Sequence, residues 1–168
     1  MIAKKSKNVL FCLLLALMSG CAADKSKPPR EICDVEIPAS AVTPLLPREG
    51  GKVTTERFKS IVAPNACSVY VEDKFYFSVL HDPERPNFSF PPNNYSRAQP
   101  STFKGKLGLD SLDAMATANC SGGKPPVFAK IILSLDESEG LYSNSRDDLE
   151  KFMNAYMPAL QKHYDCKG

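Results

Sequence analysis

Two hydrophobic segments near the middle of the chain predict a β-hairpin. Residues 68–71 and 75–80 are rich in Val, Tyr and Phe, and residues 72–74 form a short polar connection between them. This pattern is typical of two strands joined by a tight turn. Residues 127–135 alternate so that one face is continuously apolar, which predicts a further strand.

Two other segments are expected to extend the sheet. Residues 52–59 predict an edge strand, and residues 114–120 predict a strand that ends at Cys120. Residues 104–112 are interrupted by glycine and lead into the latter strand.

The C-terminal part of the chain has helical periodicity. Apolar residues recur at intervals of three and four between Leu149 and Leu160, which places them on one face of a helix. Asp147 and Asp148 suit the positive end of the helix dipole, and Ser145 can accept hydrogen bonds from the first backbone N–H groups. Pro158 is expected to kink the helix or to mark a new start.

The first part of the domain predicts only a short helical segment. Pro38 can occupy the first turn of a helix, but Pro44 keeps that helix short or distorted. With the strands and the C-terminal helix, these features predict a single α+β domain over residues 32–168. Its antiparallel sheet has four or five strands, packed against the C-terminal amphipathic helix and the N-terminal helical segment.

Residues 82–101 predict an irregular loop. They contain five of the 14 prolines, which cannot donate to a central strand, together with Phe88, Phe90 and Tyr95. These aromatic residues are either anchors that hold the loop to the domain, which we favour, or a recognition surface. In both cases the loop is the candidate contact region.

The N-terminus has the features of a bacterial lipoprotein signal. Lys4, Lys5 and Lys7 precede an apolar run of ten residues, which is too short to span a bilayer. The last two residues of the run and the three that follow it read Leu-Met-Ser-Gly-Cys (residues 17–21), which resembles the lipobox. Residues 1–20 are therefore expected to be removed, Cys21 to carry the lipid, and residues 21–31 to form a flexible tether. The alternatives are a simple signal peptide or an uncleaved anchor helix.

The lipobox also predicts where the protein is located. A lipid on Cys21 would attach it to the extracytoplasmic face of the cell membrane. Ala22 follows Cys21, so the Asp that retains many lipoproteins in the inner membrane is missing. We therefore expect the outer membrane in a Gram-negative source.

The charge argues against nucleic acid as a partner. The chain carries 21 Lys and Arg against 19 Asp and Glu, a formal charge of +2. Loss of residues 1–20 removes three lysines and no acid, which leaves a formal charge of −1. Such a domain has no large positive field with which to bind a phosphate backbone.

Four cysteines of the exported domain are expected to form two disulfides. Their spacings of 34, 53 and 46 residues are unlike those of zinc sites, so no metal is expected. Cys33 and Cys166 lie at the two ends of the domain, whereas Cys67 begins one predicted strand and Cys120 ends another. We therefore expect Cys33 to pair with Cys166, and Cys67 with Cys120.

The order of lipobox, tether, cysteine-bracketed strands and terminal helix over residues 21–166 resembles that of small actinobacterial lipoproteins. That resemblance rests on cysteine placement and hydrophobic pattern. It implies an α+β domain on the cell surface, with no assigned activity.

No motif in the chain predicts catalysis or a cofactor. A nucleophile elbow and the glycine-rich phosphate-binding motifs are missing from the sequence. His81 is expected to be an exposed histidine at the end of a strand, and His163 a cation at the end of the helix. We therefore expect a non-catalytic domain that binds a protein or another envelope component. The alternatives are an inhibitor or immunity lipoprotein against an exported enzyme, or an envelope hydrolase that uses His81.

Overall fold

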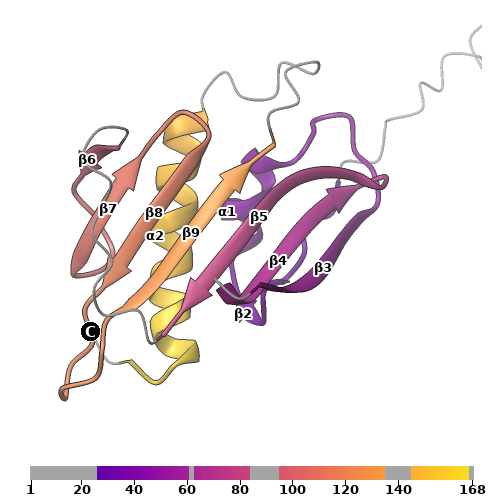
Figure 1. Ribbon diagram of the computed structural model, residues 1–168. Helices are drawn as coiled ribbons and strands as arrows, with labels where there is room; N and C mark the ends of the chain where they lie inside the picture. The colour runs from indigo at the N-terminus through magenta and orange to yellow at the C-terminus, as the bar shows by residue number, and fades with distance from the viewer. Residues whose placement is uncertain (1–25, 61–62, 84–94, 135–144, 167–168) are drawn as a thin grey trace, which may run out of the picture.

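The protein has the predicted α+β fold. The computed structural model describes residues 26–60, 63–83, 95–134 and 145–166, and Figure 1 shows the arrangement of its elements. A large antiparallel sheet packs against a long C-terminal helix, and the chain contains two disulfides. No helix in these ranges is long and apolar enough to cross a membrane.

The large sheet consists of two meanders joined at its centre. Its strands are β3 (Val53–Ser60), β4 (Ala63–Val71), β5 (Lys74–Asp82), β6 (Ser96–Ala98), β7 (Gly105–Leu109), β8 (Asp113–Ala118) and β9 (Val127–Leu133). They lie in the order β3-β4-β5-β9-β8-β7-β6, and every neighbouring pair is antiparallel. The predicted hairpin, edge strand and apolar strand are β4–β5, β3 and β9.

The sheet has seven strands instead of four or five, because the hydrophobic pattern did not reveal β6 and β7. Glycine is unfavourable in strands, and β7 contains two glycines. At Gly105, however, glycine is required. A Cβ atom there would lie 1.8 Å from the Thr117 carbonyl oxygen on β8. The close approach of two backbones, rather than a turn, explains this residue.

The remaining N-terminal elements form a small layer over the large sheet. β1 (Glu31–Ile32) and β2 (Val35–Glu36) make a two-stranded hairpin. They are followed by α1 (Ala39–Val42), which has Pro38 at its N-cap, and by the 3-10 helix η1 (Thr43–Leu45). This is the short helical segment that the two prolines predicted.

The helix α2 (Ser145–His163) covers one face of the sheet (Figure 1). Pro158 lies inside it and does not mark a new start. Proline removes the N–H that would bind the carbonyl of Asn154, but the Thr102 hydroxyl donates to that carbonyl instead. The Ser145 hydroxyl donates to the Ser111 carbonyl at 2.5 Å, which attaches the start of α2 to the β7–β8 connection.

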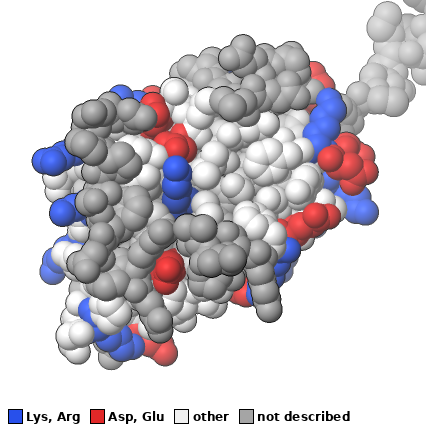
Figure 2. All heavy atoms as spheres, in the orientation of Figure 1, with Lys and Arg blue, Asp and Glu red and all other residues white. Residues whose placement is uncertain are grey.

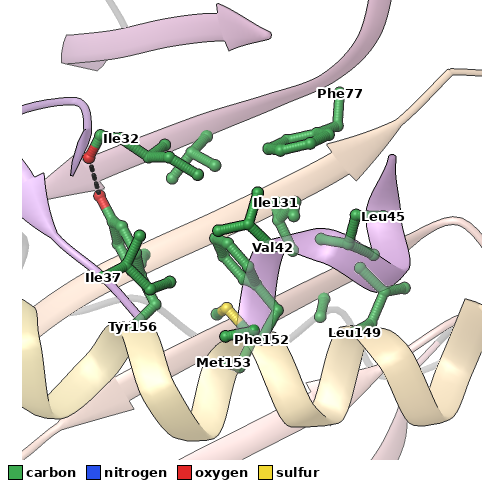
Figure 3. Packing of buried hydrophobic residues seen from close by; sticks show 14 of the residues in the cluster. Ile32, Ile37, Val42, Leu45, Phe77, Ile131, Leu149, Phe152, Met153 and Tyr156 are labelled. Carbon is green, nitrogen blue, oxygen red and sulfur yellow. Dashed lines mark hydrogen bonds between the residues drawn. The ribbon is translucent and has the colours of Figure 1, made fainter. Parts of the chain in front are cut away.

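The core lies between α2, the N-terminal layer and the sheet (Figure 3). The largest fully buried side chains of α2 include Phe152 and Tyr156, whose rings stack at 5.3 Å. Phe152 also meets Phe77 of β5 edge to face at 6.2 Å, and the Tyr156 hydroxyl donates to the Ile32 carbonyl at 3.4 Å. The predicted apolar stripe of the helix therefore binds both the sheet and the hairpin.

The opposite face of the sheet is shown in Figure 2, where uncharged side chains occupy much of the centre. Register places Tyr70, Phe75 and Leu80 on this face, because their strand neighbours face α2. Phe75 is 39% exposed and packs edge to face against Tyr70 at 5.9 Å.

The cysteine pairing differs from the prediction. Cys33 is bonded to Cys67, and Cys120 is bonded to Cys166. The predicted Cys67–Cys120 bond is excluded because β5 and β9 lie between β4 and β8. Three strand spacings of about 4.8 Å separate β4 from β8, whereas a disulfide needs Cα atoms less than about 7 Å apart.

Candidate functional site

The β1–β2 hairpin has one apolar and one acidic face. Ile32 and Val35 are 0% exposed and face the core, whereas Glu31 and Glu36 are exposed and stand directly opposite each other. Like charges at opposed positions of neighbouring strands repel each other. The hairpin therefore holds two carboxylates together on its outer face at an electrostatic cost.

The turn of this hairpin is fixed by covalent and tertiary contacts. Cys33 has φ 52° and Asp34 has φ 64°, which is the left-handed region that tight two-residue hairpin turns require. The Cys33–Cys67 disulfide attaches the turn to β4, and Asp34 forms an ion pair with Arg57 of β3. These contacts hold two non-glycine residues in a conformation that is unfavourable for them.

A cleft of about 660 Å³ separates this hairpin from the end of α2, and we call it the hairpin–helix cleft. Its volume lies in the range of small-molecule binding sites, about 300–1,000 Å³. Its lining combines acidic, basic and apolar side chains: Glu31, Asp34, Glu36, Ile37, Pro38, Ala159, Lys162 and His163.

The two walls of the cleft carry opposite charge. The carboxylates belong to the hairpin, and Lys162 and His163 belong to the last turn of α2. Asp34 is paired outside the cleft with Arg57. Within the described ranges, Glu31 and Glu36 form no ion pair with Lys162 or with any other cation. Acidic and basic residues therefore line the same cleft without forming an ion pair with each other in the described part of the chain.

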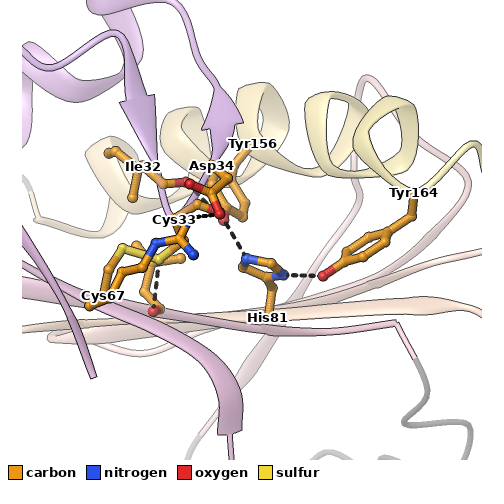
Figure 4. Close-up of a disulfide and its surroundings, with 9 residues drawn as sticks. Ile32, Cys33, Asp34, Cys67, His81, Tyr156 and Tyr164 are labelled. Carbon is orange, nitrogen blue, oxygen red and sulfur yellow. Dashed lines mark hydrogen bonds and ion pairs between the residues drawn. A yellow bond between two sulfur atoms is a disulfide. The ribbon is translucent and has the colours of Figure 1, made fainter. Parts of the chain in front are cut away.

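A chain of buried and partly buried hydrogen bonds is centred on His81, and Figure 4 shows its bonds to Cys33 and Tyr164. One ring nitrogen of His81, Nε2, lies 3.1 Å from the Cys33 carbonyl oxygen, and the other, Nδ1, lies 2.8 Å from the Tyr164 hydroxyl. The Asn65 side chain donates to the same hydroxyl at 3.2 Å. This chain joins β4 and β5, the hairpin turn and the residue that follows α2.

These partners assign the proton positions on His81. A carbonyl oxygen only accepts, so Nε2 carries the hydrogen and Nδ1 accepts from Tyr164. The pKa of His81 is lowered from 6.5 to about 4, mainly by burial; the hydrogen bond to the Cys33 carbonyl and Asp82 oppose this shift, and the nearby His163 and Arg57 add to it. His81 is therefore neutral at pH 7.

The expectation of an exposed His81 is wrong, since this residue is 2% exposed. Its side chain points to the α2 side of β5 because it is in register with Asn65 and Ala129. With Nε2 and Nδ1 both hydrogen-bonded, neither nitrogen is free to take a proton from a nucleophile. The geometry favours a structural role for His81 over the predicted alternative of a catalytic one.

Tyr95, which lies within the predicted contact loop of residues 82–101, is an anchoring residue. Its hydroxyl donates to Asp113 of β8 at 2.7 Å, and Lys130 of β9 binds the same carboxylate oxygen at 2.9 Å. The Lys130 ammonium also lies 5.9 Å from the centre of the Tyr95 ring. Burial and the bond to Asp113 raise the pKa of Tyr95 above its usual value. Phe88 and Phe90 lie outside the described residues.

Cys21 and its lipobox lie outside the described residues. No group of His, Cys, Asp and Glu in the described ranges could hold a metal ion.

Sequence reasoning did not find the hairpin–helix cleft, because its two walls are more than 120 residues apart in the chain. One signal was present, namely the alternation of Glu31, Ile32, Val35 and Glu36 around a two-residue turn.

Comparison with known proteins adds no relative to this picture. No protein-family model matches the chain, and neither a curated protein nor a solved structure matches it.

Proposed function

We propose that this protein is a lipid-anchored domain on the extracytoplasmic side of the cell envelope. In this proposal it binds a protein or another envelope component and catalyses no reaction. The observation that carries the proposal is Cys21, which follows a basic segment, a short apolar run and the small residues Ser19 and Gly20. The expected membrane is the outer membrane in a Gram-negative source and the plasma membrane otherwise.

Three features support this proposal. Two disulfides are typical of proteins that fold in an oxidising compartment. The layout resembles that of small actinobacterial lipoproteins. The hairpin–helix cleft offers a binding site, whereas His81, the histidine considered for catalysis, has both nitrogens occupied.

The anchor is tested by metabolic labelling of the full chain with an alkyne analogue of palmitate in a bacterial host. We expect wild type and Cys12→Ala to be labelled and Cys21→Ala to be unlabelled, because only the Cys21 thiol accepts the lipid. Cys12 is a matched control, since it is a second cysteine in the leader. Protease added to cells with a permeabilised outer envelope should digest the domain. Labelling of Cys21→Ala, or a protected domain, would contradict the proposal.

A further inference from the structure

The charge arrangement of the hairpin–helix cleft limits the ligands that suit it. Glu31 and Glu36 are forced together by the hairpin register, and no cation in the described ranges relieves their repulsion. A positively charged group placed between these two carboxylates would gain attraction from both and remove the cost of keeping them together. The acidic wall of the cleft therefore suits a cationic group.

The opposite wall suits an anion. Lys162 and His163 are exposed in the last turn of α2 and line the same cleft. The final carbonyls of the helix are already used, because Leu160, Gln161 and Lys162 accept hydrogen bonds from the backbone N–H groups of residues 164–166. These carbonyls therefore do not compete for hydrogen bonds from the side chains of Lys162 and His163, and the Lys162 ammonium is available to a carboxylate.

The remaining lining suits a short apolar or neutral body between the two charges. Ile37, Pro38 and Ala159 contribute mainly hydrocarbon to the cleft. A volume of about 660 Å³ equals the space of about 20 water molecules, which is too large for a bare ion to fill. A ligand with a cationic group at one end and an anionic group at the other would complement both walls.

We propose that the hairpin–helix cleft binds a short peptide with a free amino group and a free carboxylate. The amino group lies between Glu31 and Glu36, and the carboxylate lies against Lys162 and His163. This inference deepens the proposed function by naming the ligand class, and it rests on the binding role proposed there.

The probe is trialanine with free ends, titrated calorimetrically into the full chain in detergent micelles. N-acetylated trialanine and trialanine amide each lack one charge, so we expect each to bind about tenfold more weakly. O-phosphoethanolamine, a zwitterion with the chemistry of a lipid headgroup, should bind more weakly than trialanine. Equal binding of the capped peptides, no detectable binding of trialanine, or preference for O-phosphoethanolamine would overturn the inference.

Variants separate a binding role from a structural one. Glu36→Gln and Lys162→Gln should each weaken trialanine binding about tenfold, whereas Glu49→Gln and Lys151→Gln, exposed residues outside the cleft, should leave it unchanged. Glu36→Gln should also raise the melting temperature, because it removes the repulsion from Glu31. Weaker binding in a more stable variant cannot come from misfolding. Unchanged binding in Glu36→Gln and Lys162→Gln would refute the assignment.

The same titration on Cys21→Ala keeps this inference distinct from lipid anchoring. Binding by both chains supports the peptide site whether or not Cys21 is lipidated. Failure of trialanine to bind, together with palmitate labelling of Cys21, would refute the peptide site and leave the anchor intact.

Discussion

The two disulfides stabilise regions that depend on them to different degrees. Cys33–Cys67 holds a hairpin whose strands are two residues long, and both turn residues have positive φ. Cys120–Cys166 follows a helix of 19 residues that already buries an apolar stripe. An isolated hairpin is barely stable in water, whereas an amphipathic helix gains most of its stability from packing.

This difference distinguishes the effect of a disulfide on the stability of the whole protein from its effect on the order of the segment that it holds. Loop entropy depends only on the number of residues enclosed, which is 34 for one bond and 46 for the other. Local order depends on what else holds the segment. Apart from Cys33 itself, the hairpin has two buried side chains, Ile32 and Val35, whereas α2 has seven buried residues. The other tertiary contacts of the hairpin are the hydrogen bonds that its backbone carbonyls accept from His81 and Tyr156, and the ion pair between Asp34 and Arg57.

The largest expected effect is the loss of either disulfide. Cys33→Ala/Cys67→Ala and Cys120→Ala/Cys166→Ala should each lower the free energy of unfolding by about 4 kcal/mol, measured by urea denaturation. Hydrogen exchange should then distinguish them, with faster exchange throughout β1–β2 in the first variant and only in the last turn of α2 in the second. Equal protection of the hairpin with and without its disulfide would contradict the comparison.

The second largest expected effect is the loss of stability in the hairpin region at acidic pH. The folded pKa of His81 is about 4 and its unfolded value is near 6.5, so the unfolded chain binds the proton first. The contribution of neutral His81 to the free energy of unfolding is fully present above about pH 6.5. It falls by about 3 kcal/mol as the pH decreases toward 4.

Urea denaturation of wild type and His81→Gln at pH 7 and pH 4 measures this contribution. The glutamine amide has one donor and one acceptor group but does not titrate, so the variant should lose less stability on acidification. The carboxylates titrate in both proteins, so their contribution to the pH dependence of stability cancels when the two proteins are compared. An identical pH dependence would show that His81 is not the titrating group.

The smallest expected effects come from removing single polar contacts, one near each disulfide. Tyr164→Phe removes the donor to His81 and the acceptor for Asn65, and should cost about 1–3 kcal/mol. Gln161→Met removes one bond at the other region, to the Asn119 carbonyl at 2.8 Å, and should cost about 1 kcal/mol. Equal costs in urea denaturation would mean that the buried chain around His81 adds nothing beyond one hydrogen bond.

Much of the fold could be predicted because local patterns report local structure. The hairpin β4–β5, the strand β9 and the stripe of α2 follow from spacing alone, since side-chain direction repeats every two residues in a strand and every 3.6 in a helix. The short strands β6 and β7 escaped because their pairing depends on neighbours rather than on their own residues. Glycine is required at position 105 because the backbone of β8 approaches so closely that a Cβ atom would clash with it.

The candidate site was harder to predict, because each part depends on residues that are remote in sequence. His81 has an ordinary sequence context, and only its direction toward α2 buries it. Pro158 would disrupt an isolated helix, but Thr102 satisfies the carbonyl that it leaves free. The hairpin–helix cleft combines residues from both ends of the domain.

The sequence by itself determined the fold class, the main strands, the helix and an even number of cysteines available for bonding. It also carries the lipobox prediction. The tertiary structure decided which cysteines pair, which histidine is buried and where opposite charges face each other. Periodicity is set by the geometry of one backbone segment, whereas distances between remote residues depend on strand order and packing. The insertion of β5 and β9 between β4 and β8 therefore excluded the predicted bond between Cys67 and Cys120.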